Sequence, residues 1–168
     1  DVIRLPFLPT FNDFQFKSRT KFDKKNELTV VGLGAIDQFK LNLGIDDPTE
    51  EQRFILSSIP VNEQWSYAIG GVYKHFREKS YQTLVVSRNH LNNVAYKYFE
   101  NDDSSEDNKI LDYESQEIEN KLRYESTNRF SGYKLIYGAN LDFAKYTNST
   151  FQKRFAGDDV FNVDYDTE

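Results

Sequence analysis

The sequence contains no cysteine, no methionine and only one tryptophan among its 168 residues. Without cysteine there are no disulfide bonds, no thiolate chemistry and no zinc site of the cysteine type. The lack of methionine, together with Asp at position 1, leads us to expect a processed chain or a piece of a longer one. No apolar run approaches the roughly 18 residues of a transmembrane helix, which excludes a helical membrane protein.

What the chain has in abundance is aromatic side chains, with 14 Phe and 11 Tyr. Together with Val, Ile and Thr, these residues favour β-strands. The length suits a single domain. The mean hydropathy of −0.71 resembles that of a soluble protein. However, a transmembrane barrel strand is only half apolar and gives a similarly weak signal, so hydropathy leaves both classes open.

The segment 11–22 separates two kinds of side chain by strict alternation. A strand turns successive side chains to opposite faces, so the segment is predicted to be a strand with one charged and one aromatic face. The charged set is Asp13, Gln15, Lys17, Arg19 and Lys21, and the other set is Phe14, Phe16, Ser18, Thr20 and Phe22.

Five further segments, 27–41, 65–76, 81–98, 113–125 and 131–147, also have strand character. Two of them, 27–41 and 81–98, alternate poorly. The last two alternate better. In 114–125 one face carries Glu117, Glu119, Lys121 and Arg123, and in 131–146 the apolar face carries Tyr133, Leu135 and Tyr137.

The connections between these segments alternate in length. Short polar turns at 23–26, 77–80 and 126–130 are separated by long connections at 42–64 and 99–112, and a third long stretch follows Asn148. This order predicts a meander with all its turns at one end, as in outer-membrane barrels.

Charge is sorted in the same way. The segments 43–64, 100–113 and 157–168 hold 16 of the 27 acidic residues but only Arg53 and Lys109 of the 21 basic ones, a net charge of −14. The rest of the chain has a net charge of +8. One end of the predicted sheet is therefore acidic and its wall is basic.

Three blocks carry a resemblance to a known family: 5–14 (LPFLPTFNDF), 32–37 (GLGAID) and 81–91 (YQTLVVSRNHL). They resemble the barrel of TonB-dependent outer-membrane receptors, in the subgroup that often carries an N-terminal carboxypeptidase-regulatory-like domain. The resemblance implies uptake of a large or scarce nutrient by a barrel filled with a plug and energised by the TonB complex. The chain then supplies wall strands only, without plug, TonB box or regulatory domain.

This resemblance gives each face an expected environment. Asp13, Gln15, Lys17, Arg19, Lys21, Glu117, Glu119, Lys121 and Arg123 are expected to face the lumen or the plug, and Phe14, Phe16, Phe22, Tyr133, Leu135 and Tyr137 to face lipid. The solvated face and core face of a soluble sheet are the alternative. The expected partners are the rest of the barrel and plug, the TonB complex and outer-membrane lipid. A surface lipoprotein is a further candidate partner. Nucleic acid is not expected.

Aromatic residues lie near both ends of the predicted strands. Trp65 and Tyr67 adjoin a long connection, and Tyr73, Phe76 and Tyr81 adjoin a short turn. They are interpreted as two membrane-interface girdles or, equally, as core aromatics at strand ends.

No catalytic site, cofactor or metal site is predicted. His75 and His90 are isolated, and no serine lies in a nucleophile motif. The acidic stretch 101–108 has oxygen ligands for calcium but lacks the spacing of an EF-hand loop, so a solvated loop is the better interpretation.

The prediction is therefore an all-β antiparallel meander in which residues 1–168 form about six strands of a partial transmembrane β-barrel in the outer membrane. Two alternatives remain open: a passive outer-membrane barrel or scaffold without TonB coupling, and a soluble β-sandwich or lipocalin-like binding module.

Overall fold

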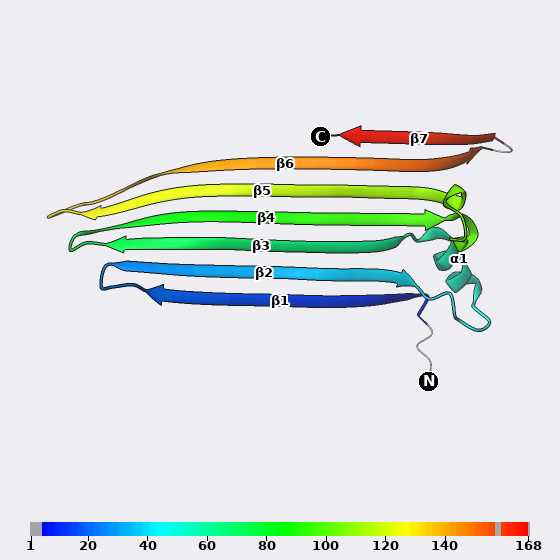
Figure 1. Cartoon of the computed structure of the whole chain (residues 1–168), viewed down its shortest axis with the longest axis horizontal. Coiled ribbons are helices and arrows are strands. Elements are labelled where there is room, and N and C mark those ends of the chain that lie inside the picture. The colour runs from blue at the N-terminus through cyan, green and yellow to red at the C-terminus, as the bar shows by residue number, and fades with distance from the viewer. Residues whose placement is uncertain (1–4, 157–158, 168) are drawn as a thin grey trace.

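The computed structural model describes residues 5–156 and 159–167 and consists of one antiparallel sheet. Seven strands follow one another in chain order, and each pairs with the next (Figure 1). The all-β meander predicted from the sequence is confirmed. The sheet is open, because β1 and β7 lie at opposite edges and do not pair. The strands are β1 Phe7–Lys21, β2 Asn26–Leu41, β3 Val61–Phe76, β4 Ser80–Tyr98, β5 Lys109–Arg129, β6 Lys134–Ala156 and β7 Asp159–Thr167.

The connections sort by length as predicted, but the prediction of a turn at 126–130 was wrong, because β5 continues to Arg129 and pairs with β6 there. Short turns at 22–25, 77–79 and 130–133 join strands at one end of the sheet, which we call the turn end. The connections 42–60 and 99–108 lie at the other end, which we call the loop end (Figure 1). The first contains helix α1 (Glu50–Ser58), and the second contains the short 3-10 helices η1 (Phe99–Asn101) and η2 (Glu106–Asn108).

An Asx turn fixes the first hairpin at the turn end. The Asp23 carboxylate accepts hydrogen bonds from the backbone N–H groups of Lys25 and Asn26, at 2.6 and 2.8 Å, and from the Asn26 side chain. These bonds hold the pKa of Asp23 below its ordinary value, the Asn26 side chain contributing most. Asp is common at such a position because its short side chain can accept hydrogen bonds from the backbone N–H groups of the turn.

The C-terminal part of the chain differs from the prediction. A strand ending near residue 147 and a long acidic connection after it were expected, but β6 continues to Ala156 and β7 pairs with its last nine positions. The sheet therefore has seven strands rather than six. The prediction was wrong because polar residues at 148–150 resemble a loop locally, whereas β5 supplies a hydrogen-bonding partner there.

Helix α1 was also not predicted. Thr49 caps it, accepting from the backbone N–H of Gln52 at 3.2 Å while the Gln52 side chain accepts from the Thr49 N–H at 2.8 Å. This is a capping box, which the Thr-x-x-Gln spacing encodes. Among the described residues no helix is long and apolar enough to cross a membrane.

The sheet has no hydrophobic core within the described residues. No aliphatic or aromatic side chain among them is buried except that of Pro6, and the polar residues Ser126 and Thr127 are each only 1% exposed. A layer of sheet normally buries one face against a second layer. Here the described residues supply a single layer, and both of its faces are open.

Candidate functional site: two faces of one sheet

The register assigns every strand residue of β1 to β6 to one of two faces. The apolar face contains the even-numbered residues of β1, β2, β4 and β5 and the odd-numbered residues of β3 and β6. The polar face contains the others. We call a set of residues that pair with one another across β1 to β6 a level. One level on the apolar face, for example, is Phe14–Gly34–Tyr67–His90–Ile118–Lys145.

The structure places the residues singled out from the sequence on two opposite faces. All nine lumen or plug candidates, from Asp13 to Arg123, lie on the polar face, although they come from β1 and from β5. Phe14, Phe16, Leu135 and Tyr137 share the apolar face. The other two lipid candidates lie in turns. Phe22 follows β1, and Tyr133 stacks on Phe130 with ring centroids 4.6 Å apart.

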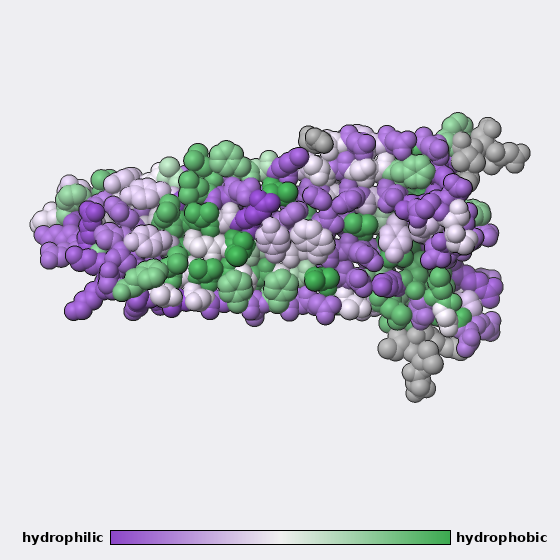
Figure 2. All heavy atoms as spheres, in the orientation of Figure 1, coloured by the Kyte–Doolittle hydropathy of each residue, from purple (hydrophilic) through white to green (hydrophobic). Residues whose placement is uncertain are grey.

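Large apolar side chains crowd the apolar face and remain exposed there. Val86 is 54% exposed and Phe143 65% exposed. In Figure 2 hydrophobic residues gather over the middle of the strands, while the turn end on the left is mainly hydrophilic. The exposed members of this face are Leu8, Phe14, Phe16, Ile36, Trp65, Ile69, Tyr73, Leu84, Val86, Leu122, Tyr124, Leu135, Tyr137, Leu141 and Phe143.

Two aromatic rings of β1 complete this face by covering glycines of β2. Phe14 pairs with Gly34 and Phe16 with Gly32, and a Cβ atom on either glycine would overlap the ring opposite. An aromatic ring that covers a cross-strand glycine fills the gap which the missing side chain leaves. These glycines also explain why segment 27–41 lacks clear alternation.

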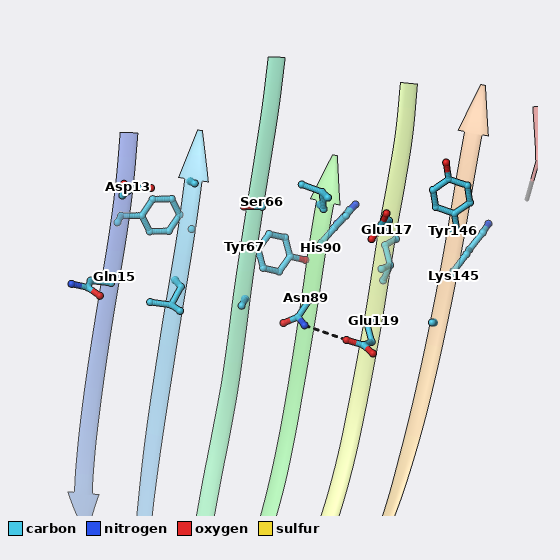
Figure 3. Close-up of a pocket in the computed structure, with 18 residues that line it drawn as sticks. Asp13, Gln15, Ser66, Tyr67, Asn89, His90, Glu117, Glu119, Lys145 and Tyr146 are labelled. Carbon is cyan, nitrogen blue, oxygen red and sulfur yellow. Dashed lines mark hydrogen bonds between the residues drawn. The ribbon is translucent and has the colours of Figure 1, made fainter. Parts of the chain in front are cut away.

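The polar face lies against an open hollow of about 1230 Å³. Two complete levels of polar-face side chains line it, and the backbone of the level between them forms its floor. Figure 3 shows these residues spread over β1 to β6, with the Asn89 side chain donating to Glu119 at 3.3 Å. Small residues, including Ala35, Ser66 and Ala68, keep its centre open.

Several charges on the polar face pair with one another. Arg19 reaches Glu27 at 2.7 Å, Lys121 reaches Glu119 at 2.9 Å and Arg123 reaches Glu125 at 2.7 Å. The basic partner in each pair is exposed to solvent, which screens the attraction, although Glu27 itself is buried. The pairs therefore organise the face more than they stabilise the sheet.

The aromatic residues near the strand ends divide between the faces. Trp65 and Tyr67 stack on the apolar face with ring centroids 6.2 Å apart, and Tyr73 lies on the same face nearer the turn end. Phe76 and Tyr81 pair across the hairpin on the polar face instead. Phe76 and Tyr81 therefore do not share a face with Tyr73, because each lies an odd number of residues from the apolar-face positions of its own strand.

Helix α1 is tethered to the polar-face side of the sheet by Lys97. This residue is 5% exposed, and its Nζ donates to the carbonyl oxygens of Leu56 and Ile59, at 2.5 and 3.0 Å, and to Asn101 Oδ1 at 2.6 Å. Three acceptors satisfy all three donors of the ammonium group. Lys97 thus joins the C-terminal end of α1, the start of β3 and η1 at the loop end.

The acidic connection 99–108 is hydrogen bonded internally. Asp102 accepts from the Ser104 N–H at 3.0 Å and from Asn108 at 2.9 Å, and Glu106 accepts from Tyr98 and pairs with Lys109, both at 2.9 Å. These contacts lower the pKa of both carboxyl groups, led by Ser104 for Asp102 and by Lys109 for Glu106. Across residues 5–156 and 159–167, no three Asp, Glu or His side chains come together in a way that could hold a metal ion.

Three residues on the apolar face were not singled out as site residues from the sequence. His90 and Lys145 lie one level from Trp65 toward the turn end, and Arg88 lies two levels from it. Arg88 and His90 explain the poor alternation of segment 81–98. No local signal identifies them as a group, because only the register brings β4 and β6 onto one face.

Comparisons with known proteins add no family or relative. No protein-family model matches the chain, and no curated protein matches it.

Proposed function

We propose that this chain is a wall segment of a TonB-dependent outer-membrane receptor that takes up a large or scarce nutrient. The observation that carries the proposal is the exposed apolar face, which lies opposite a hollowed polar face in a sheet without a core. Lipid is the environment in which such a face is stable, and strands with apolar and polar sides facing lipid and lumen are the pattern of membrane barrels.

The dimensions of the apolar face support a membrane position. On β3 it runs from Trp65 to Tyr73, and a tilted transmembrane strand needs about 9–11 residues. Trp65 and Tyr67 lie toward the loop end and Tyr73 toward the turn end, as interface aromatics do. The strands continue past Trp65 toward the loop end, so the wall projects beyond the bilayer on that side. We assign the loop end to the cell exterior.

The TonB-dependent part rests on the three sequence blocks and on the polar face. In this proposal the hollow faces a plug, the rows around Lys17 and Lys121 contact it by charge-assisted hydrogen bonds, and the tethered helix α1 lies at the outer mouth. No side chain performs covalent chemistry. Substrate capture at the loop end precedes plug rearrangement driven by the TonB complex.

The test uses the full-length protein that contains this chain. We expect it to require detergent for extraction, to conduct little current in a planar bilayer in KCl, and to bind the isolated C-terminal domain of TonB. Replacing Lys17 and Arg19 by Glu is expected to raise the KCl conductance by weakening plug contacts, whereas Lys24→Glu in the first turn serves as the matched control.

Two outcomes would contradict the proposal. Steady open-channel conductance without TonB binding would identify a passive barrel. Recovery of the full-length protein in the water-soluble fraction without detergent would favour a soluble binding module.

A further inference from the structure

The apolar face carries an isolated positive cluster. Among the described residues of β1 to β6, Arg88 and Lys145 are the charged side chains on this face between the levels of Trp65 and Tyr73. No carboxylate lies on these levels of the face. By contrast, the polar face at the same levels mixes acids with bases, as in the pair Glu119–Lys121.

Neutral partners hold Arg88 in place. Its Nε donates to the Tyr67 hydroxyl at 3.0 Å, and one terminal nitrogen donates to Asn120 Oδ1 at 3.0 Å. A guanidinium has five N–H donors, so these bonds orient the group and leave donors for an anion. No ion pair of Arg88 or Lys145 occurs in the described part of the chain, whereas Lys109 and Lys121 each have a carboxylate partner.

The cluster lies beside the interface aromatics. Trp65 packs edge-on against His90 with ring centroids 4.7 Å apart, and Tyr67, which accepts from Arg88, packs edge-on against the same imidazole at 5.7 Å. His90 and Lys145 share one level, and Arg88 lies on the next level toward the turn end. Trp and Tyr in such positions mark the level of lipid head groups. The backbone of Arg88 lies two levels from Trp65, and its long side chain contacts Tyr67, as cationic side chains that extend toward the head groups do.

Arg88 and Lys145 are close enough to share one anion. They lie two strands and one level apart, which places their Cα atoms roughly 12 Å from each other from a strand spacing of about 4.8 Å and a rise of about 3.3 Å per residue. Two long side chains can close this separation on a single phosphate group.

We propose that Arg88, Lys145 and the Tyr67 hydroxyl form a binding site for the phosphate head group of a lipid in the outer leaflet. This inference rests on the proposed membrane position. Charge complementarity selects the occupant, because a phosphorylated lipid brings the negative charge that this face lacks and acyl chains that cover its apolar residues. The phosphate contacts are charge-assisted, and Arg88 is oriented for them in advance.

The test is lipid retention by the full-length protein purified in detergent and titrated with phosphatidylglycerol, measured by native mass spectrometry. The wild-type protein is expected to retain phosphatidylglycerol. The double variant Arg88→Gln/Lys145→Gln is expected to bind it about 25-fold more weakly, about fivefold for each cation. Lys74→Gln, which removes a positive charge from the polar face of β3, is the matched control and should bind as the wild type does.

A conservative variant and a competition experiment separate lipid binding from non-specific effects. Lys145→Arg preserves the charge and should retain the lipid, and inorganic phosphate alone should not compete at millimolar concentration. Equal retention by the double variant and the wild type would overturn the site, as would a detergent-dependent protein that retains no lipid at all. A full-length protein that is soluble without detergent would instead overturn the membrane position on which the site depends.

Discussion

Replacing Val86 by arginine probes the apolar face between the levels of Trp65 and Tyr73. Val86 lies on the level of Gly71, six residues from the level of Trp65. With a strand tilt near 40°, each residue advances about 2.5 Å along the membrane normal. In the proposed membrane position, Val86 therefore lies about 15 Å from the level of Trp65 and about 5 Å from the level of Tyr73, inside the apolar band.

An arginine at this depth is expected to lower the free energy of unfolding in a bilayer by about 1–3 kcal/mol, between the cost at the midplane and the cost at the interface. Ile36→Arg lies on the level of Trp65, where the cost falls to about 0–1 kcal/mol. Leu33→Arg is the matched control, because Leu33 is 47% exposed on the polar face and Val86 is 54% exposed on the apolar face. A water-facing substitution of this kind is expected to change stability by about 0.5 kcal/mol or less.

The assay is urea-dependent unfolding of the full-length protein in phospholipid vesicles, followed by tryptophan fluorescence. The reasoning predicts a large loss for Val86→Arg and small losses for Ile36→Arg and Leu33→Arg. Equal, small effects of Val86→Arg and Leu33→Arg would refute it, because a bilayer distinguishes the two faces whereas water on both sides does not.

Three further predictions concern the loop end, the glycine cover and the turn end. Lys97→Met removes all three hydrogen bonds of the ammonium group, so faster hydrogen exchange is expected in α1 and unchanged exchange at the turn end. Gly32→Ala displaces the Phe16 ring and should lower the free energy of unfolding, measured in urea, by about 1 kcal/mol. Gly71→Ala, which places its new Cβ where nothing lies within 4 Å, should leave the free energy of unfolding unchanged or raise it slightly. Because the pKa of Asp23 is lowered in the fold, the stability that its carboxylate contributes is present above the unfolded-state pKa of about 4 and is lost as pH falls through the lower folded-state pKa. Protection of the amides of residues 25–26 from hydrogen exchange should fall in that pH range. Asp23→Asn should abolish this pH dependence.

The sequence predicts much of this fold because its signals are local. Alternation at 11–22 places Lys17 and Phe16 on opposite faces, and the structure has them there. Short polar turns mark the hairpins for the same reason. Helix α1 also has a local signal in its capping box, which the surrounding strand pattern obscured.

What the sequence could not provide depends on partners across the sheet. Gly32 interrupts the hydrophobic pattern of β2, and only its pairing with Phe16 shows that the face is complete. The strand character of 148–156 depends on β5 and β7 rather than on apolar residues. Likewise, Arg88 and Lys145 become neighbours through the register of β4, β5 and β6.

The central claim is that the two faces of this sheet meet lipid and water, and spin labels on adjacent residues of β5 test it most directly. This chain has no cysteine, so Leu122→Cys and Lys121→Cys introduce single labelling sites within it. In reconstituted full-length protein, the label at 122 should be accessible to oxygen dissolved in lipid and shielded from a water-soluble nickel reagent. The label at 121, on the face toward the plug, should be shielded from oxygen dissolved in lipid. Equal accessibility of both labels to that oxygen would contradict the account.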